Sequence, residues 1–173
     1  LAHARRLLDT AAELASELSG KLAGPSGWVR LSVSTIIAQA LIVPALPSLA
    51  ERHPQLHVDL LADDRIADMA RDGIDIAVRT GTPASDALVA RRIGALTRRL
   101  YAAPAYARRH GLPEHPDALA AHRLIGNSGI AALNQWRLVR GRETHELTVR
   151  GHTRSDNTAV VMLLAQHGLG IAR

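Results

Sequence analysis

The sequence predicts an α/β fold, because short apolar strands alternate with helical segments and turn residues along most of the chain. Residues 29–33 alternate apolar and polar side chains as a half-buried strand does, and residues 57–61 and 74–79 form two further strands. Helical segments separate these three strands. Strand–helix–strand–helix–strand within about fifty residues is the order of a parallel sheet.

The composition sets limits on the core and the cellular setting. Of 173 residues 47% are hydrophobic, but only 2% are aromatic and none is Phe, so we expect a core of Leu, Ile, Val and Ala. No apolar run is long enough to cross a bilayer. The sequence has no cysteine and shows no secretion signal, which favours the cytoplasm and no membrane association.

The positive charge is concentrated in the second half. Residues 99–173 contain 10 Lys and Arg against 5 Asp and Glu, whereas residues 1–24 and 25–98 are each balanced, and the net charge is +5. Such an excess indicates acidic ligands or nucleic acid. It is equally typical of an arginine-rich solvated surface.

Residues 1–19 carry the strongest helical pattern. Leu and Ala recur at alternating spacings of three and four, and Gly20, Gly24 and Pro25 end the helix. The stripe has two interpretations, which the sequence leaves open. It is either a stalk that pairs with a second copy of the chain, or an amphipathic helix packed on its own domain.

The first strand leads directly into a helix start. Ser34 and Thr35 stand where an N-cap belongs, and we expect a short helix from about Thr35, a break near Val43 and a second helix over 44–52. A strand that delivers a helix N-terminus with hydroxyl groups to a sheet edge is an anion-binding arrangement.

The third strand ends in Arg79, followed by the loop residues Thr80 and Gly81. Ligands of open α/β sheets bind at the carboxyl ends of the strands, so Arg79 is a candidate ligand contact. The alternative is a surface arginine paired with a neighbouring carboxylate. Asp63 and Asp64 are expected to cap the helix that follows the second strand.

The second half predicts a strand-like run at 88–93, short helices at 104–110 and 115–121, and a strand at 124–125. A polar turn of Gly126, Asn127, Ser128 and Gly129 follows. Residues 135–139 and 146–151 predict a hairpin, and a helix over 158–166 follows Asp156 and Asn157.

The sequence indicates no catalytic chemistry. It contains no nucleophile elbow, no phosphate loop and no complete dinucleotide fingerprint. The nine histidines are scattered without metal-ligand spacing. We therefore expect no catalytic residues, no metal and no cofactor, and the absence of a helix-turn-helix signature disfavours direct DNA reading by these residues.

Three blocks of sequence resemble one protein family. They are Gly27–Ser34 with Pro44–Pro47 and Arg52–Pro54, then Asp72–Gly81, and then Ser155–Asn157 with Gly168–Ala172. Together, in this order, they resemble the effector-binding domain of LysR-type transcriptional regulators. Residues 1–19 resemble the linker helix that precedes this domain and pairs in the dimer.

The resemblance implies two Rossmann-like subdomains of periplasmic-binding-protein type II architecture, preceded by an α-helical linker. The expected limits are residues 1–24 for the linker, 25–98 for subdomain I and 99–173 for subdomain II. It implies that the family's DNA-binding domain precedes Leu1, and that the effector domain continues beyond Arg173.

The resemblance also implies the function. The family binds small, often anionic effectors in a cleft between the subdomains, acts on DNA through its separate DNA-binding domain, and forms homodimers or tetramers. The positions that match its effector site are Ser34, Thr35, Arg79, Thr80, Gly81, Asn127, Ser128, Gly129, Asp156 and Asn157.

Two other classes remain as alternatives. A periplasmic-type solute-binding protein has the same two-lobed architecture, but the missing export signal and the helix at 1–19 disfavour it. An α/β enzyme is disfavoured by the absence of any nucleophile or acid–base pair.

Overall fold

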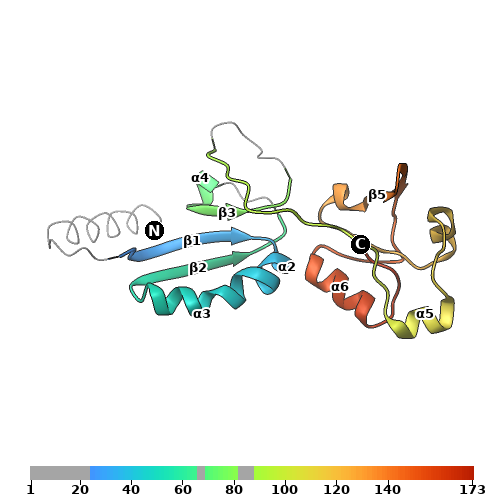
Figure 1. The fold of residues 1–173 in the computed structure, drawn as a ribbon, viewed down its shortest axis with the longest axis horizontal. Coiled ribbons are helices and arrows are strands. Elements are labelled where there is room, and N and C mark those ends of the chain that lie inside the picture. The colour runs from blue at the N-terminus through green and yellow to red at the C-terminus, as the bar shows by residue number, and fades with distance from the viewer. Residues whose placement is uncertain (1–23, 66–68, 82–87) are drawn as a thin grey trace. The chain divides into compact units, whose positions relative to one another are not determined.

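The computed structural model describes residues 24–65, 69–81 and 88–173 (Figure 1). The helix expected over residues 1–19 lies outside these ranges. Internal contacts divide the chain into two compact units, Leu1–Arg79 and Thr80–Arg173, and each is described here by itself. The subdomain limits expected at residues 98 and 99 stay a prediction.

Unit 1 is built on a parallel three-stranded sheet with the order β2-β1-β3. The strands are β1 (Gly27–Val33), β2 (Leu56–Ala62) and β3 (Ile76–Val78). Val33 pairs with Ala62 on one side and with Val78 on the other, so all three strands end at the same edge. The parallel sheet predicted from the alternation of strands and helices is confirmed.

One unbroken helical path follows β1. It consists of α2 (Thr35–Ile37), a π-helical segment η1 (Ala38–Ile42) and α3 (Val43–Arg52). The break expected near Val43 is therefore wrong. The amide of Val43 bonds to the carbonyl of Ala38, five residues back, and this wider turn carries the helix into Pro44, whose ring would crowd a regular α-turn.

The core of unit 1 lies where the helix meets the strand ends. Val33, Ile37 and Ala38 are buried together, and Ile42, Leu60 and Val78 pack against them. Figure 1 shows α3 alongside β2. Arg30 of β1 contacts both sides of the sheet: its Nε pairs with Asp59 Oδ2 in β2 at 3.0 Å, and its amide donates to Oδ2 of Asp75, the residue before β3, at 2.8 Å.

The described part of unit 2 contains two pairs of strands and four helical segments. The elements are α5 (Pro104–His110), η2 (Pro116–Ala121), β4 (Ile125–Asn127), η3 (Ala131–Asn134), β5 (Gln135–Arg140), β6 (Glu143–Thr148), β7 (Thr153–Ser155) and α6 (Thr158–Gln166). The fold confirms the predicted helices at 104–110 and 158–166. The hairpin is confirmed too, with β6 beginning three residues earlier than expected.

One expected element of unit 2 differs. Residues 88–93 form no strand, because their backbone finds no pairing partner within the described part of the chain. The short helix expected at 115–121 is confirmed over residues 116–121, where it is a 3₁₀-helix. Six residues allow only a short helix, and the backbone returns to an extended conformation at His122.

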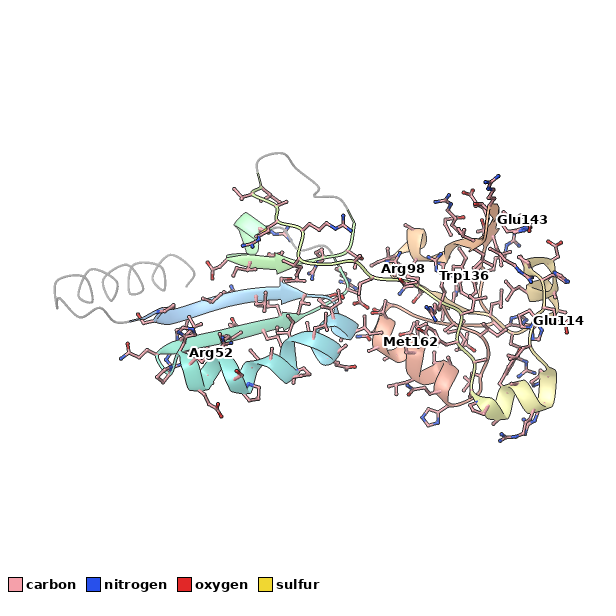
Figure 2. The ribbon with its side chains drawn as sticks, viewed as in Figure 1. Arg52, Arg98, Glu114, Trp136, Glu143 and Met162 are labelled. Carbon is pink, nitrogen blue, oxygen red and sulfur yellow. The ribbon has the colours of Figure 1, made fainter. Side chains whose placement is uncertain are left out.

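The core of unit 2 uses aromatic residues, against the expectation of a purely aliphatic interior. Tyr106 and Trp136 are both 2% exposed, and Leu119, Leu124 and Ile171 pack with them. Figure 2 shows Trp136 within unit 2 and Glu143, at the hairpin turn, on its outside. Low aromatic content did not exclude aromatic residues from the core, because two of the four are buried.

The end of the chain closes this unit. Ile171 bridges to Leu124 and Ala172 to Tyr101, and both are buried. Gly170 lies against the backbone of Arg123 so closely that a Cβ atom there would fall on its carbonyl oxygen. Among the described residues, no helix is long and apolar enough to cross a bilayer.

Candidate functional site

The strand ends of unit 1 bring two predicted site residues to one edge. Val33 pairs with Val78, so Ser34 and Arg79, the next residue of each chain segment, leave the sheet side by side in register. Ser34 has the extended backbone of an N-cap, as predicted, but its side chain makes no capping hydrogen bond. The Ser34 hydroxyl therefore does not serve to close the helix.

Asp64 closes the helix start instead. Its Oδ1 accepts hydrogen bonds from the backbone amide and from the hydroxyl of Thr35, both at 3.0 Å, and its side chain is buried. Asp63 accepts from the amide of Arg65 at 2.9 Å, at the start of the segment after β2. Thr35 lies at the predicted position, but Asp64 engages both its amide and its hydroxyl.

Arg79 spans the same edge. Its Nη2 donates to Ser32 Oγ at 2.6 Å and to the carbonyl of Arg65 at 3.2 Å, and its Nη1 donates to the carbonyl of Val78 at 3.2 Å. Partial burial lowers the pKa of Arg79, while the carboxylates of Asp63 and Asp64 act to raise it. These three bonds engage part of a guanidinium that offers five donors.

Thr80 and Gly81 follow Arg79 directly and belong to unit 2 by their contacts. Both are exposed. The Thr80 hydroxyl accepts a hydrogen bond from Nη2 of Arg98 at 3.3 Å. Gly81 has φ of 109°, which favours glycine at this turn.

The second edge is in unit 2, where β4 and β7 run parallel and end together. Asn127 pairs with Ser155, and the amide of Ser128 donates to the carbonyl of Ser155 at 2.9 Å. Asp156 and Asn157 come next and lead into α6. The turn after β4 and the start of α6 are therefore neighbours.

Asn127 organises this edge. Its Oδ1 accepts from the amides of Gly129 at 2.9 Å and Ile130 at 2.6 Å. Its backbone amide and carbonyl bond to the side chain of Asn134, each at 2.7 Å. The residue is buried, and its Nδ2 has no hydrogen-bond partner among the described residues.

Asn157, and not Asp156, caps α6. The Asn157 Oδ1 accepts from the amides of Ala159 at 2.9 Å and Val160 at 3.2 Å, and the Asn157 amide donates to Ser155 Oγ at 3.2 Å. Asp156 is exposed. It packs against Gly129, where an added Cβ would lie 3.0 Å from the Cβ of Asp156.

The predicted site residues thus fall into groups that the two units hold separately. Unit 1 brings together Ser34, Thr35 and Arg79, and unit 2 brings together Asn127, Ser128, Gly129, Asp156 and Asn157. Sequence reasoning missed the parts played by Asp64 and Asn134, which act across 29 and 7 residues. The available signal for Asp64 was its position: it is a typical N-cap residue, and it follows a strand that neighbours the strand before Thr35.

The arrangement offers hydroxyl, amide and guanidinium groups without a reactive pair. Within the described ranges, no three His, Cys, Asp or Glu side chains are placed to hold a metal ion. Polar groups at the carboxyl ends of parallel strands define an α/β protein of the small-molecule-binding class.

The family follows from sequence comparison. A family model described as the LysR substrate binding domain matches residues 22–173. The chain belongs to this family, the effector-binding domains of LysR-type transcriptional regulators.

Relatives and solved structures agree. The chain is 29% identical over 170 residues to the HTH-type transcriptional regulator DmlR of Escherichia coli, covering 98% of this chain and 55% of the relative. It is 30% identical to an uncharacterised HTH-type regulator of Haemophilus influenzae, covering 95% and 56%. The chain therefore spans about half the length of these curated relatives.

Two solved structures share the fold. The regulatory domain of CrgA from Neisseria meningitidis, a LysR-type regulator, is 24% identical with a TM-score of 0.77, covering 86% of this chain and 72% of that one. Full-length AphB of Vibrio cholerae, a virulence activator of the same family, is 28% identical with a TM-score of 0.75, covering 96% and 57%. The predicted α/β, periplasmic-binding-protein-like architecture is confirmed.

Proposed function

We propose that this chain senses a small anionic effector for a LysR-type transcriptional regulator, and that Ser34, Arg79, Asn127 and their neighbours contact it. The observation that carries the proposal is the polar edge at the strand ends of each unit. Val33 and Val78 end beside each other in unit 1, as Asn127 and Ser155 do in unit 2. Ligands of α/β proteins bind at such edges.

The uncapped hydroxyl of Ser34 favours an anionic group in unit 1. Ser34 stands at the start of an 18-residue helical path, Thr35–Arg52, and its side chain makes no capping bond. Arg79 supplies a positive charge one strand away, and three of its hydrogen bonds fix its position. A hydroxyl, a guanidinium and a helix start together stabilise a carboxylate.

The partners follow from the family. The relatives are named as HTH-type transcriptional regulators, which supports DNA contact through a domain separate from these residues. The proposed assembly is a homodimer or tetramer that acts in the cytoplasm, without a cofactor and without catalysis. The match to DNA-binding regulators disfavours the solute-binding alternative.

A ligand-binding screen tests the proposal. The melting temperature of the protein is measured with a panel of aliphatic and aromatic carboxylic acids, and at least one acid is expected to raise it. Ser34→Ala should reduce the rise, since a lost hydrogen bond to a charged ligand weakens binding by about 10- to 100-fold. The substitution should cost less than about 1 kcal/mol of stability because no cap bond is lost.

Ser48→Ala is the matched control. Ser48 is an exposed serine on α3, away from the strand ends, so this variant should keep the full ligand-induced rise. An unchanged rise in Ser34→Ala removes Ser34 from the site. A panel in which no acid raises the melting temperature argues against an anionic effector.

A further inference from the structure

The turn after β4 holds a buried hydrogen-bond donor that lacks an acceptor. Asn127 is 6% exposed, and its Nδ2 has no partner among the residues that the structure describes. The orientation of the amide is fixed, because Oδ1 accepts from the amides of Gly129 and Ile130. Flipping it would point NH₂ at two donors. A buried donor without an acceptor destabilises the fold, and an acceptor atom of a ligand would remove that penalty.

The adjoining helix start has little left to offer an anion. The amides of Ala159 and Val160 already donate to Asn157 Oδ1, and the amide of Val161 donates to the carbonyl of Asn157. The amide of Asn157 itself donates to Ser155 Oγ. The amides of Ala159, Val160 and Val161 are therefore bonded to neutral groups of Asn157 and do not require a ligand carboxylate.

Asp156 places a negative charge at the same turn. Its carboxylate belongs to an exposed residue whose Cβ packs on Gly129, two residues after Asn127. The nearest cation along β7 is Arg154, which pairs with Gly126 one position back from the edge and packs its stem against Gly126 and Gly151. A carboxylate ligand at the turn would meet a like charge, whereas an N–H or O–H group could donate to Asp156.

We infer that the end of the effector held by unit 2 is a neutral group with an oxygen acceptor, such as an amide or a hydroxyl, and not a carboxylate. Asn127 Nδ2 donates to that oxygen, and Asp156 accepts a hydrogen bond from the N–H or O–H of the same group. This inference rests on the proposed function and deepens it. It names the effector class as a monoanion whose far end is an uncharged polar group, and it disfavours dicarboxylates.

Three isosteric probes test the inference without knowledge of the effector. The three probes share an acetyl group and differ in the second substituent on its carbonyl carbon. This substituent is a neutral hydrogen-bond donor in acetamide, an apolar methyl group in acetone and an anionic oxygen in acetate. Each is titrated into the protein while the side-chain NH₂ resonances of Asn127 and the amide of Ser128 are followed by ¹⁵N NMR. We expect acetamide to bind most tightly, acetone next, and acetate about tenfold more weakly than acetamide. A tenfold difference corresponds to the one charge-assisted hydrogen bond that acetamide can donate to Asp156 and acetate cannot.

Two variants separate the contributions. Asn127→Asp keeps Oδ1 for the amides of Gly129 and Ile130 but replaces the donor by an acceptor, so binding of acetone, read at the Ser128 amide, should be lost. Asp156→Asn changes an exposed side chain and should narrow the difference between acetamide and acetate to about threefold or less. Asp156→Asn carries the test by itself where Asn127→Asp does not fold.

The inference is overturned when acetate binds the unaltered protein as tightly as acetamide. It is equally overturned when no probe shifts the NMR resonances of the Asn127 side-chain NH₂. In that case a bound water molecule, or the packing around Asn127, explains why this donor has no acceptor in the protein. The proposed function fails by a different result, the absence of any melting shift with the acid panel. A protein that responds to acids but prefers acetate here keeps its function and loses only this inference.

Discussion

The two units close their strand ends with different chemistry. In unit 1 the contacts are charged: the Asp64 carboxylate accepts from Thr35, and the Arg79 guanidinium donates to Ser32. In unit 2 they are neutral: Asn127 exchanges bonds with Asn134, and Asn157 caps α6. Both edges follow parallel strands, so backbone topology does not dictate the chemistry of the edge.

The charged edge of unit 1 and the neutral edge of unit 2 should differ in how much stability is lost when a polar group there has no hydrogen-bond partner. A buried carboxylate such as Asp64 requires donors in fixed positions, so it ties the segment after β2 to the helix after β1. Neutral amides tolerate an unfilled position better, and Asn127 Nδ2 is an instance. We therefore expect the stability of unit 1 to depend more on the hydrogen bonds at its edge. We expect the stability of unit 2 to depend more on the packing of its core.

The largest expected effect breaks unit 2 alone. Gly170→Ala places a methyl group against the backbone carbonyl oxygen of Arg123, which cannot move away as a flexible side chain could. The substitution should lower the free energy of unfolding by about 3 kcal/mol. A Trp28→Phe background leaves buried Trp136 as the fluorescent reporter of unit 2 during urea unfolding. Gly94→Ala, where nothing lies within 4 Å of the added Cβ, is the control. Equal midpoints for the two variants would contradict the close approach.

The next effect compares the two caps directly. Asp64→Ala leaves the Thr35 amide and hydroxyl without their acceptor and should cost about 2 kcal/mol, whereas Asn157→Ala should cost about 1 kcal/mol. Native-state hydrogen exchange of β1 amides reports on the first variant, and exchange of α6 amides on the second. If Asn157→Ala proves the more damaging, the charged edge is not the more sensitive one.

The smallest effect concerns the ion pair on the sheet of unit 1. Arg30 and Asp59 are paired at 3.0 Å with side chains 39% and 41% exposed, so Asp59→Asn should cost less than about 1 kcal/mol. The measurement is urea unfolding at low salt and at about 1 M salt, where screening should remove most of the difference. A loss that is large and independent of salt would show that this pair, too, belongs to the tightly held part of unit 1.

Local patterns in the sequence were sufficient for the regular elements. The apolar run after Asn157 and the glycines after His167 delimited α6, and the alternation around Leu31 identified β1. These signals are contained within a few residues. Family resemblance supplied the order of the elements and the positions at both edges.

Long-range contacts escaped the same reasoning. Asp64 was expected at the start of the helix that follows it in sequence, and its hydrogen bonds to Thr35, at the helix after the neighbouring strand, were not foreseen. β7 is a three-residue polar strand, Thr153–Ser155, without apolar alternation, and only its pairing with β4 defines it. Residues 88–93 have a strand-like sequence but no partner in the described ranges, and a strand exists only by pairing.

The π-helical segment Ala38–Ile42 has a consequence for the surface of α3. Each helical residue rotates the chain by about 100° around the helix axis. The number of residues in this segment therefore decides in which direction the side chains of α3 point. Deleting a single residue there would restore an ordinary α-turn and swing Leu46 and Leu49 away from Leu56 and Val58, which they now face across a shared groove. The extra residue thus acts as a spacer that aims the apolar stripe of α3 at the sheet.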